Sequence, residues 1–246
     1  LTRGEGIDVE VPSLNSSSSY VGATPGQDFY PGEGEIGNQI GVAEAVAPIA
    51  NKATTAVYMA ENWSTVVSGS NNDYFKAGNW ELAAGRTFTE AEERAGKAVC
   101  VIGDTVRTKL FGGQNPVGSE IRIKQFACEV VGLLKAKGQS AMGSDQDDTV
   151  VMPLRTVQRR LTGSQDVNRL TVSVREGASI DAVKDQLTLL LRERRNIGET
   201  EEDDFRVLDT RQLAETLTGT TRILTMLLGA VAAVSLLVGG IGIMNI

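Results

Sequence analysis

RLTVSVREGASIDAVKDQLTLLLRERRNIGETEEDDFRVLD, residues 169–209, is the stretch that decides the fold. Leu170, Val172 and Val174 alternate with other residues, which predicts a strand with one buried face. Ser179 then stands where a helix N-cap is favoured. The predicted helix carries one apolar stripe, made of Ile180, Val183, Leu187, Leu190 and Leu191. After the acidic loop ETEEDD, FRVL predicts a second strand, so the stretch forms half of an α/β module.

The other half of the module is expected in residues 36–70. Here AVAPIANKATTAVYMAENWSTVVSGSN shows an alternation broken by Pro48 and Asn62, which predicts a hairpin that ends near Gly69. The preceding residues 1–35 are rich in Gly, Ser, Pro and Asn, and they predict an irregular arm with IDVEV as its one strand candidate.

Residues 71–164 differ from both halves in their pattern of short apolar runs and turn residues. The runs VCVIG, SEIRIK, CEVVGLL and TVVMPL predict short strands separated by turn clusters such as FGGQNPVG. DTVRTKLFGG predicts a short helix, capped by Asp104 and ended by Gly112. The fold class is therefore α+β: an α/β domain built from residues 36–70 and 165–209, with a β-rich insert at 71–164.

The end of the chain is apolar: residues 222–246 read RILTMLLGAVAAVSLLVGGIGIMNI, and no residue after Arg222 is charged. Roughly 20 apolar residues in a helix cross a bilayer core, so this run predicts the start of a transmembrane helix. A helix buried in a globular core is the alternative. The residues Gly239, Gly240 and Gly242 permit close packing against another membrane helix, or are merely tolerated in lipid.

A stiff connection is expected between the body and this run, because residues 210–246 contain no proline. They predict one stalk helix whose first turns carry the polar residues Gln212 and Glu215. Gly219 is the weakest point of that stalk.

Composition excludes several classes of function. With a net charge of -7, the chain is a poor partner for nucleic acid, and the absence of histidine excludes His-based catalytic triads and His-ligated metals. It holds no GxxxxGK[ST] nucleotide motif, so we expect any ATPase on another segment or chain. No nucleophile–base pair stands out either, and we expect no cofactor and no catalytic residues. The two cysteines, Cys100 and Cys128, lie in apolar runs and read as buried thiols, or as a disulfide in an oxidising compartment.

The loop GQSAMGSDQDD, residues 138–148, concentrates polar groups. Three carboxylates in it are compatible with a calcium site, but the spacing differs from that of an EF-hand. A solvated loop that touches a partner is the other interpretation. Our candidates for partner contact are Gln139, Asp145, Gln146, Asp147 and Asp148. Trp63 and Trp80 fill the core or anchor an interface.

Several of these runs together resemble the MacB-type permeases of ABC exporters, within the FtsX-like permease superfamily. The similar segments, which lie between residues 42 and 246, are NDYFKAGNWELAAGRTFTEAEE, KAVCVIGDTVRTKLFGGQNPVGSEIRIKQFACEVVGLLKAKGQ, GSDQDDTVVMPLRTVQRRLTG and LLVGGIGIMNI. The resemblance implies a periplasmic domain between the first two of four membrane helices, so we expect this sequence to be an excised segment. The split α/β domain corresponds to the family's Porter part, and the insert to its Sabre part.

The resemblance also implies partners and a location. Such permeases are homodimers of the bacterial inner membrane, driven by a cytoplasmic ATPase, and this branch meets a periplasmic adaptor that leads to an outer-membrane channel. A similar acidic loop in the family makes residues 138–148 the first candidate for an adaptor or dimer contact. The expected function is mechanical coupling of ATP hydrolysis to export. The alternatives are a membrane-tethered binding or signalling module and a lipoprotein-releasing permease domain.

Overall fold

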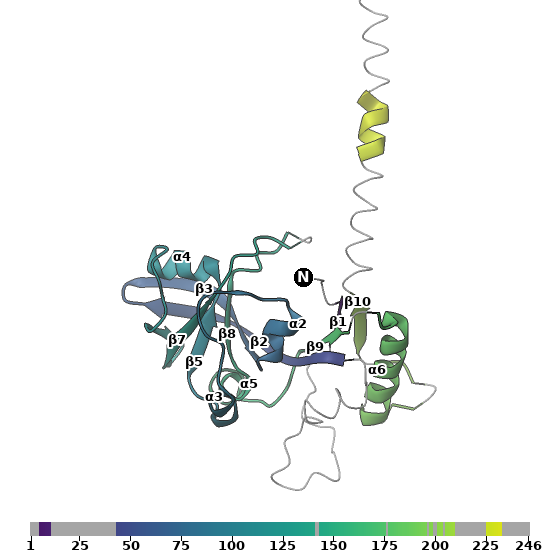
Figure 1. Cartoon of the computed structure of the whole chain (residues 1–246), viewed down its shortest axis with the longest axis horizontal. Helices are drawn as coiled ribbons and strands as arrows, with labels where there is room; N and C mark the ends of the chain where they lie inside the picture. The colour runs from purple at the N-terminus through teal and green to yellow at the C-terminus, as the bar shows by residue number, and fades with distance from the viewer. Residues whose placement is uncertain are drawn as a thin grey trace, which may run out of the picture. The chain divides into compact units, whose positions relative to one another are not determined.

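A computed structural model of the chain is shown in Figure 1. It divides into two units, Leu1–Leu208 and Asp209–Ile246, which are treated separately below. The structure describes residues 5–10, 43–140, 143–175, 177–195, 197–198, 201–203, 205–209 and 225–232.

The first unit contains a small sheet, which we call the sheet lobe. Its strands, in the order β10-β1-β9-β2, are β10 (Arg206–Asp209), β1 (Glu5–Glu10), β9 (Arg169–Val174) and the first half of β2 (Ala43–Tyr58). In this sheet β9 pairs antiparallel with both β1 and β2. The predicted strand near the N-terminus is thus confirmed, and it lies inside the sheet, where Ile7 pairs with Val172.

Helix α6 (Ile180–Arg195) packs on the sheet lobe with the predicted apolar stripe. The backbone N–H of Ala182 donates to the Ser179 hydroxyl at 3.4 Å, which confirms the predicted cap. The hydrophobic core of this lobe consists of Ile7, Val9, Val46, Val172, Val174, Val183, Leu187 and Phe205.

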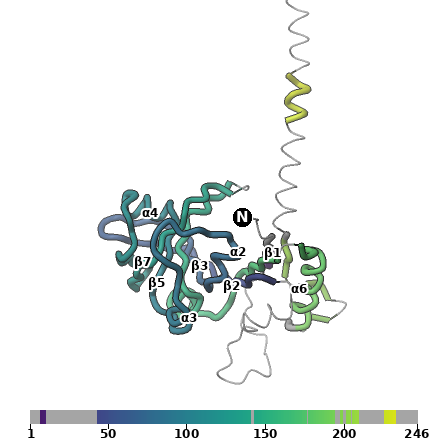
Figure 2. The backbone as a smooth tube through the Cα atoms, viewed as in Figure 1, coloured from purple at the N-terminus to yellow at the C-terminus, as the bar shows by residue number. Residues whose placement is uncertain are grey.

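The second half of β2 begins a closed ring of six strands, which we call the barrel. Around the ring, β2 pairs with β3, β3 with β8, β8 with β5, β5 with β7, β7 with β6, and β6 again with β2. The bounds are β3 (Glu61–Ser70), β8 (Thr149–Pro153), β5 (Val99–Ile102), β7 (Phe126–Leu134) and β6 (Glu120–Ile123). A further strand, β4 (Leu82–Gly85), pairs with β7 outside the ring. Figure 2 shows the backbone of the same segments as a tube, with β5 and β7 near helix α4.

Side chains of successive residues on these strands enter two different cores, as the period of a β-strand requires. In β8, Val150 and Met152 belong to the cluster that all six strands share, whereas Val151 belongs to a second one. Helix α4 (Asp104–Phe111), helix α5 (Leu154–Val157) and the π-helical turn η1 (Gln158–Thr162) add side chains to the shared cluster. The second cluster receives Phe75 from helix α2 (Asp73–Ala77) and Phe88, which precedes helix α3 (Glu90–Ala95).

The strand breaks expected at Pro48 and Asn62 are wrong. Strand β2 runs through Pro48, β3 contains Asn62, and the hairpin turns between Tyr58 and Glu61. The Ile49 carbonyl accepts a hydrogen bond from the backbone of Asn168, which precedes β9, so alternation directs the missing Pro48 N–H away from β9. A proline at such a position leaves the ladder intact.

Beyond the end of the β2–β3 backbone ladder, side chains that follow β3 donate hydrogen bonds to carbonyls of β2. The β2–β3 ladder ends at Ala50 and Gly69. Beyond it, the Ser70 hydroxyl donates to the Pro48 carbonyl at 2.7 Å, and the Asn71 amide donates to the Val46 carbonyl at 3.2 Å. Because these buried carbonyls would otherwise be unpaired, the two side chains stabilise β2 where it passes from the barrel into the sheet lobe.

The N-cap of helix α4 lies one residue earlier than predicted. Gly103 occupies the N-cap, and Asp104 is the first helical residue, paired with Arg107 at 2.7 Å. The predicted end is confirmed, since Gly112 has a φ of 59°.

In the second unit, residues 225–232 form a helix whose side chains are exposed. Within the described ranges, none of the helices has the length and apolar character needed to cross a membrane. The predicted stalk and helix-packing residues lie outside the described residues; they are Gln212, Glu215, Gly219, Gly239, Gly240 and Gly242.

Candidate functional site

The predicted contact residues gather on one projection, residues 137–148, which we call the arm. It connects β7 to β8, and the structure describes it except for residues 141–142 (Figure 1). Its two sides pair through a bridge between Gln139 and Asp145, and the Ser140 N–H donates to the Ser144 carbonyl at 2.8 Å. The arm is thus a short hairpin with internal hydrogen bonds.

Asp147 holds the base of the arm together. Its side chain is buried, and its two carboxylate oxygens accept the backbone N–H groups of Lys137 at 2.9 Å and Gly138 at 2.8 Å. A buried carboxylate needs such partners, and charge-assisted bonds of this kind are the strong ones. Asp147 therefore ties the outgoing strand of the arm to the returning one.

Space at this base is also restricted. A Cβ on Gly103 would lie 2.1 Å from the Asp147 carbonyl oxygen, well inside contact distance. The loop before α4 and the returning strand of the arm therefore meet backbone to backbone.

The other two carboxylates contact the barrel. Asp145 accepts the Thr105 hydroxyl at 2.7 Å with one oxygen and the backbone N–H of Asp147 at 2.9 Å with the other. Asp148 accepts the indole N–H of Trp63 at 2.9 Å. The sequence did not indicate Thr105 or Trp63 as partners of the arm, because residues so far apart in the chain leave no local pattern.

The two predicted glutamines differ in exposure. Gln139 is exposed, whereas Gln146 is half-buried and its backbone N–H donates to the Gly138 carbonyl at 3.2 Å. The structure thus brings all five predicted residues onto one arm but directs the three carboxylates to partners within the chain. Among the described residues, no three Asp, Glu or Cys side chains are grouped as a metal site would require.

The two tryptophans pack against different clusters of the barrel. Trp63 contacts the shared cluster of the six strands, and Trp80 contacts the second cluster. A cation also lies over each indole ring. The ammonium nitrogen of Lys109 is 4.8 Å from the centroid of the Trp63 ring, and that of Lys137 is 3.7 Å from the centroid of the Trp80 ring. Lys137 is part of the arm, so Trp80 supports its first strand.

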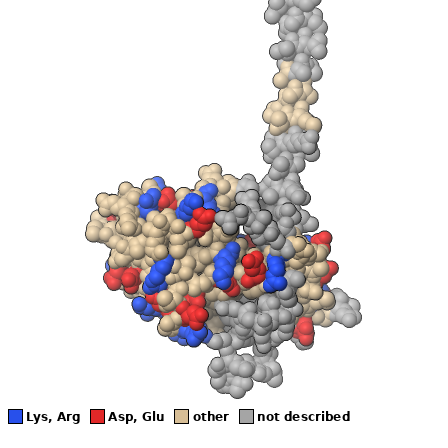
Figure 3. Space-filling view, in the orientation of Figure 1, with Lys and Arg blue, Asp and Glu red and all other residues tan. Residues whose placement is uncertain are grey.

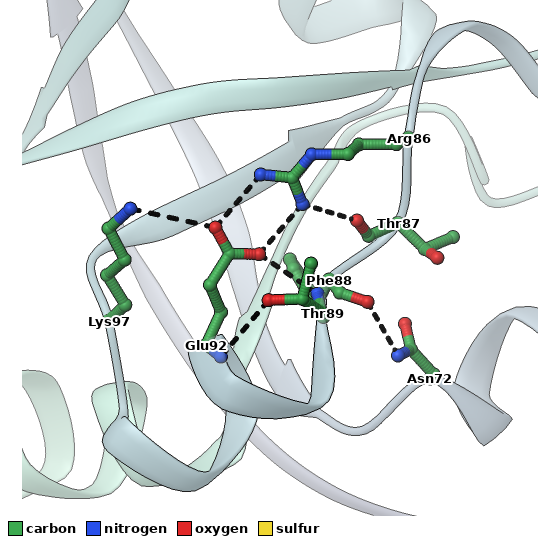
Figure 4. A network of polar contacts seen from close by, with 7 residues as sticks. All are labelled: Asn72, Arg86, Thr87, Phe88, Thr89, Glu92 and Lys97. Atoms are coloured by element: carbon green, nitrogen blue, oxygen red, sulfur yellow. Dashed lines mark hydrogen bonds and ion pairs between the residues drawn. The ribbon is translucent and has the colours of Figure 1, made fainter.

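A second polar network fixes helix α3, as Figure 4 shows. The Arg86 guanidinium donates to both oxygens of Glu92, at 2.7 and 2.9 Å, and the ammonium of Lys97 lies 3.7 Å from the same carboxylate. Glu92 also accepts the backbone N–H of Thr89 at 2.9 Å, while the Thr89 hydroxyl accepts the backbone N–H of Glu92 at 3.3 Å. This reciprocal pair is a capping box.

The bonds from Arg86 lower the pKa of Glu92 to about 2, against the opposing effect of burial. The same bonds raise the pKa of Arg86. One sequence signal for this network exists, since Thr-Phe-Thr-Glu-Ala-Glu at residues 87–92 contains the Thr-x-x-Glu pattern of a capping box, but it was not among the predicted features. The network holds helix α3 to the segment that precedes it, which indicates a structural role.

The thiols of Cys100 and Cys128 are free and fully buried in the shared cluster of the barrel. Burial raises the pKa of Cys128 well above its ordinary value. The interpretation as buried thiols agrees with this geometry.

Charge is mixed over the visible face of the molecule. Figure 3 shows basic and acidic side chains interspersed, with no large patch of one sign among the described residues of that face. Several of the described charges are paired, as Lys135 and Glu81 are at 2.7 Å. That pairing lowers the pKa of Glu81 and raises that of Lys135.

Known proteins are similar to this chain in sequence and in fold. A family model described as the MacB-like periplasmic core domain matches residues 4–190. The chain is 32% identical over 265 residues to the macrolide export ATP-binding/permease protein MacB of Syntrophobacter fumaroxidans, covering 86% of this chain and 37% of that protein. It is 39% identical over 180 residues to the pyoverdine export ATP-binding/permease protein PvdT of Pseudomonas entomophila, covering 72% and 27%. The chain thus spans about a third of the length of these relatives.

Solved structures agree with the fold. The periplasmic region of MacB from Actinobacillus actinomycetemcomitans superposes with a TM-score of 0.65 at 17% identity, over 87% of this chain and 92% of that one. The extracellular domain of the transporter YknZ from Gram-positive bacteria gives 0.59 at 21% identity, over 83% and 100%. The family match over residues 4–190, the identity to MacB proteins and this common fold agree, and the chain belongs to the family of MacB-like periplasmic core domains.

Proposed function

We propose that this chain is the periplasmic part of an ABC-type efflux permease that couples cytoplasmic ATP hydrolysis mechanically to outward export. The observation that carries the proposal is the family match over residues 4–190. Relatives that share this segment are named as macrolide and pyoverdine export ATP-binding/permease proteins. Because the chain holds no GxxxxGK[ST] motif, the ATPase belongs to another segment or another chain.

The two lobes give the proposal a structural form. We assign the sheet lobe to the Porter-like part and the barrel to the Sabre-like insert. The backbone pairing favours a junction inside β2 near Ile49, where β2 exchanges β9 for β3, over one after residue 70. Residues 210–246 then form the stalk and the start of a membrane helix, with Gly239, Gly240 and Gly242 as helix-packing positions.

The arm is the proposed contact with a periplasmic adaptor protein, which leads to an outer-membrane channel. Its internal hydrogen bonds support this role, because a preformed loop loses little conformational freedom on binding. The permease itself is proposed to be a homodimer of the bacterial inner membrane, with the bulk of this chain in the periplasm.

Mechanical transmission through the stalk is tested by an insertion of Gly-Gly-Pro between Gln212 and Glu215, which would interrupt a stalk helix. We expect ATP-dependent export by the full permease to be lost, while its assembly with the ATPase and the ATPase activity persist. The same insertion between Glu201 and Glu202, in the exposed loop before β10, is the control. Unchanged export by the stalk variant would refute mechanical transmission through this segment.

A further inference from the structure

Within the described ranges, the chain passes between the sheet lobe and the barrel in two places. One crossing lies inside β2, which leaves β9 and meets β3 next to Ile49. The other is the segment of residues 163–168, which follows η1 and leads into β9. In that segment the Gln165 carbonyl accepts the side-chain amide of buried Gln158 at 2.9 Å. The position of one lobe on the other therefore depends on how firmly these two crossings are held.

The edge of β2 that faces β9 stays bonded past the end of the sheet lobe. The Ile49 carbonyl accepts the backbone N–H of Asn168, and the Asn168 side-chain oxygen accepts the backbone N–H of Asn51, both at 2.9 Å. Asn51 already belongs to the barrel, where it pairs with Ser68 of β3. The side chain of Asn168 thus extends the β9 ladder into the barrel, and it joins the two crossings of the chain.

On the other edge of β2 the extension runs in the opposite direction. The Ser70 hydroxyl donates to the Pro48 carbonyl at 2.7 Å, and the Asn71 amide donates to the Val46 carbonyl at 3.2 Å. Val46 and Pro48 are residues of the sheet lobe that pair with β9, whereas Ser70 pairs with β8 of the barrel. The bonds of the two edges therefore overlap along β2, and neither edge is released before the other is held.

The backbone of β2 offers no hinge of its own. Its residues 43–58 contain no glycine, the residue that most readily takes up a large change in φ and ψ. Pro48, in the middle of the overlap, has its φ fixed by the pyrrolidine ring. The covalent chain thus adds to the stiffness that the hydrogen bonds give.

Helix α2 supports the junction from the side. It lies against both β2 and β9, while its Phe75 is buried in the second cluster of the barrel (Figure 1). Asn72, just before it, donates its backbone N–H to a Glu93 carboxylate oxygen at 2.6 Å and its side-chain amide to the Phe88 carbonyl at 2.8 Å. A helix fixed to the barrel in this way opposes a displacement of the sheet lobe.

We infer that this junction makes the sheet lobe and the barrel one rigid body, with Asn71 and Asn168 as the residues that position one lobe on the other. Bending of β2 toward either edge stretches a side-chain hydrogen bond on the opposite edge. The inference deepens the proposed function and rests on it for its meaning. A displacement of β10, which leads toward the proposed stalk, reaches the barrel only if the junction does not bend.

Pulsed EPR distances between two spin labels on the full chain test the inference. One label is attached at Gln114→Cys, in the loop after α4, and the other at Asp185→Cys, on α6; both residues are exposed. We expect a distance distribution with a single maximum. The chain without the two added cysteines should take up no label, because Cys100 and Cys128 are fully buried.

Asn71→Ala combined with Asn168→Ala removes one side-chain bond from each edge of β2. We expect the distribution to widen at least about twofold, because hinge motion between the lobes is then opposed by fewer bonds. Asn168→Ala alone, at an exposed residue, should widen it in the same direction even if the double variant does not fold. Asn168→Asp keeps the acceptor for Asn51 and should give the wild-type width. Asn62→Ala, at an exposed residue near the far end of β3, is the matched control and should also leave the width unchanged.

The outcomes separate the junction from the proposed function. Two maxima in the wild-type distribution, or an unchanged width in Asn168→Ala and in the double variant, would overturn the rigid junction. A widening in Asn168→Asp equal to that in Asn168→Ala would overturn the positioning role of the bond to Asn51. Unchanged export after the stalk insertion, together with a single wild-type maximum, would refute the proposed function and leave the junction standing.

Discussion

The substitution Glu92→Gln tests how strongly a single carboxylate holds helix α3 on the barrel. The change keeps the shape of the side chain, and glutamine can still serve the capping box. It removes the negative charge of Glu92, which accepts two hydrogen bonds from Arg86 and lies close to the ammonium of Lys97. The side chain of Glu92 is 9% exposed, so little solvent replaces these partners.

The size of the effect follows from the pKa. Its lowering from 4.5 to about 2 corresponds to at most about 3.4 kcal/mol, at 1.36 kcal/mol for each pKa unit. Arg86 and Lys97 are 50% and 58% exposed, so solvent screens part of this interaction. We therefore expect Glu92→Gln to lower the free energy of unfolding by about 2 kcal/mol at pH 7.

The pH dependence has a definite sign. A carboxyl whose pKa is lower in the folded state stabilises the protein above its unfolded pKa of 4.5, and that stability is lost as the pH falls toward 2. The difference between wild type and Glu92→Gln should thus shrink to less than half by about pH 3.

The assay is urea unfolding of the full chain at both pH values, followed by the fluorescence of Trp63 and Trp80. Glu90→Gln is the matched control, because Glu90 and its partner Arg94 are 81% and 77% exposed on the same helix. That variant should differ from wild type by less than about 0.5 kcal/mol. A Glu92→Gln protein as stable as wild type, or one equally destabilised at both pH values, would refute the reasoning.

Three further predictions concern the barrel. Gly69→Ala should lower the free energy of unfolding by about 2 kcal/mol, because its Cβ would lie 2.6 Å from the Val157 Cβ; an unchanged urea midpoint would contradict this packing. Asn71→Ala leaves a buried β2 carbonyl unpaired and should cost about 1–2 kcal/mol in the same assay, and a neutral result would remove its role at the junction. Cys100 and Cys128 should react with maleimide only after unfolding, so rapid labelling of the native chain, followed by mass spectrometry, would disprove their burial.

The elements with strong periodicity were predictable. The stripe of α6 and the alternating apolar residues of β9 appear in the structure as expected, because both sets pack into the core of the sheet lobe. The hairpin that ends near Gly69 is confirmed, but the break expected at Pro48 was wrong, because only the direction of its missing N–H makes this proline harmless. That direction depends on β9, which lies more than a hundred residues further along the chain.

The closure of the barrel was beyond local reasoning as well. The ring depends on the pairing of β6 with both β2 and β7, and no local pattern specifies which strands meet. The acidic loop was recognised from its composition, but composition does not reveal where a carboxylate points. The sequence favours a solvated position for Asp147. In the structure its side chain is buried at the base of the arm, where its carboxylate accepts two backbone N–H groups.

The most direct test of the account is photo-cross-linking in intact cells, with a photoreactive amino acid at Gln139 of the full permease. The account predicts an adduct with the periplasmic adaptor of the same export system, and none from the equivalent probe at Gln114. No adduct at Gln139, or an adduct with a protein other than an adaptor, would contradict the central claim that this arm meets the adaptor.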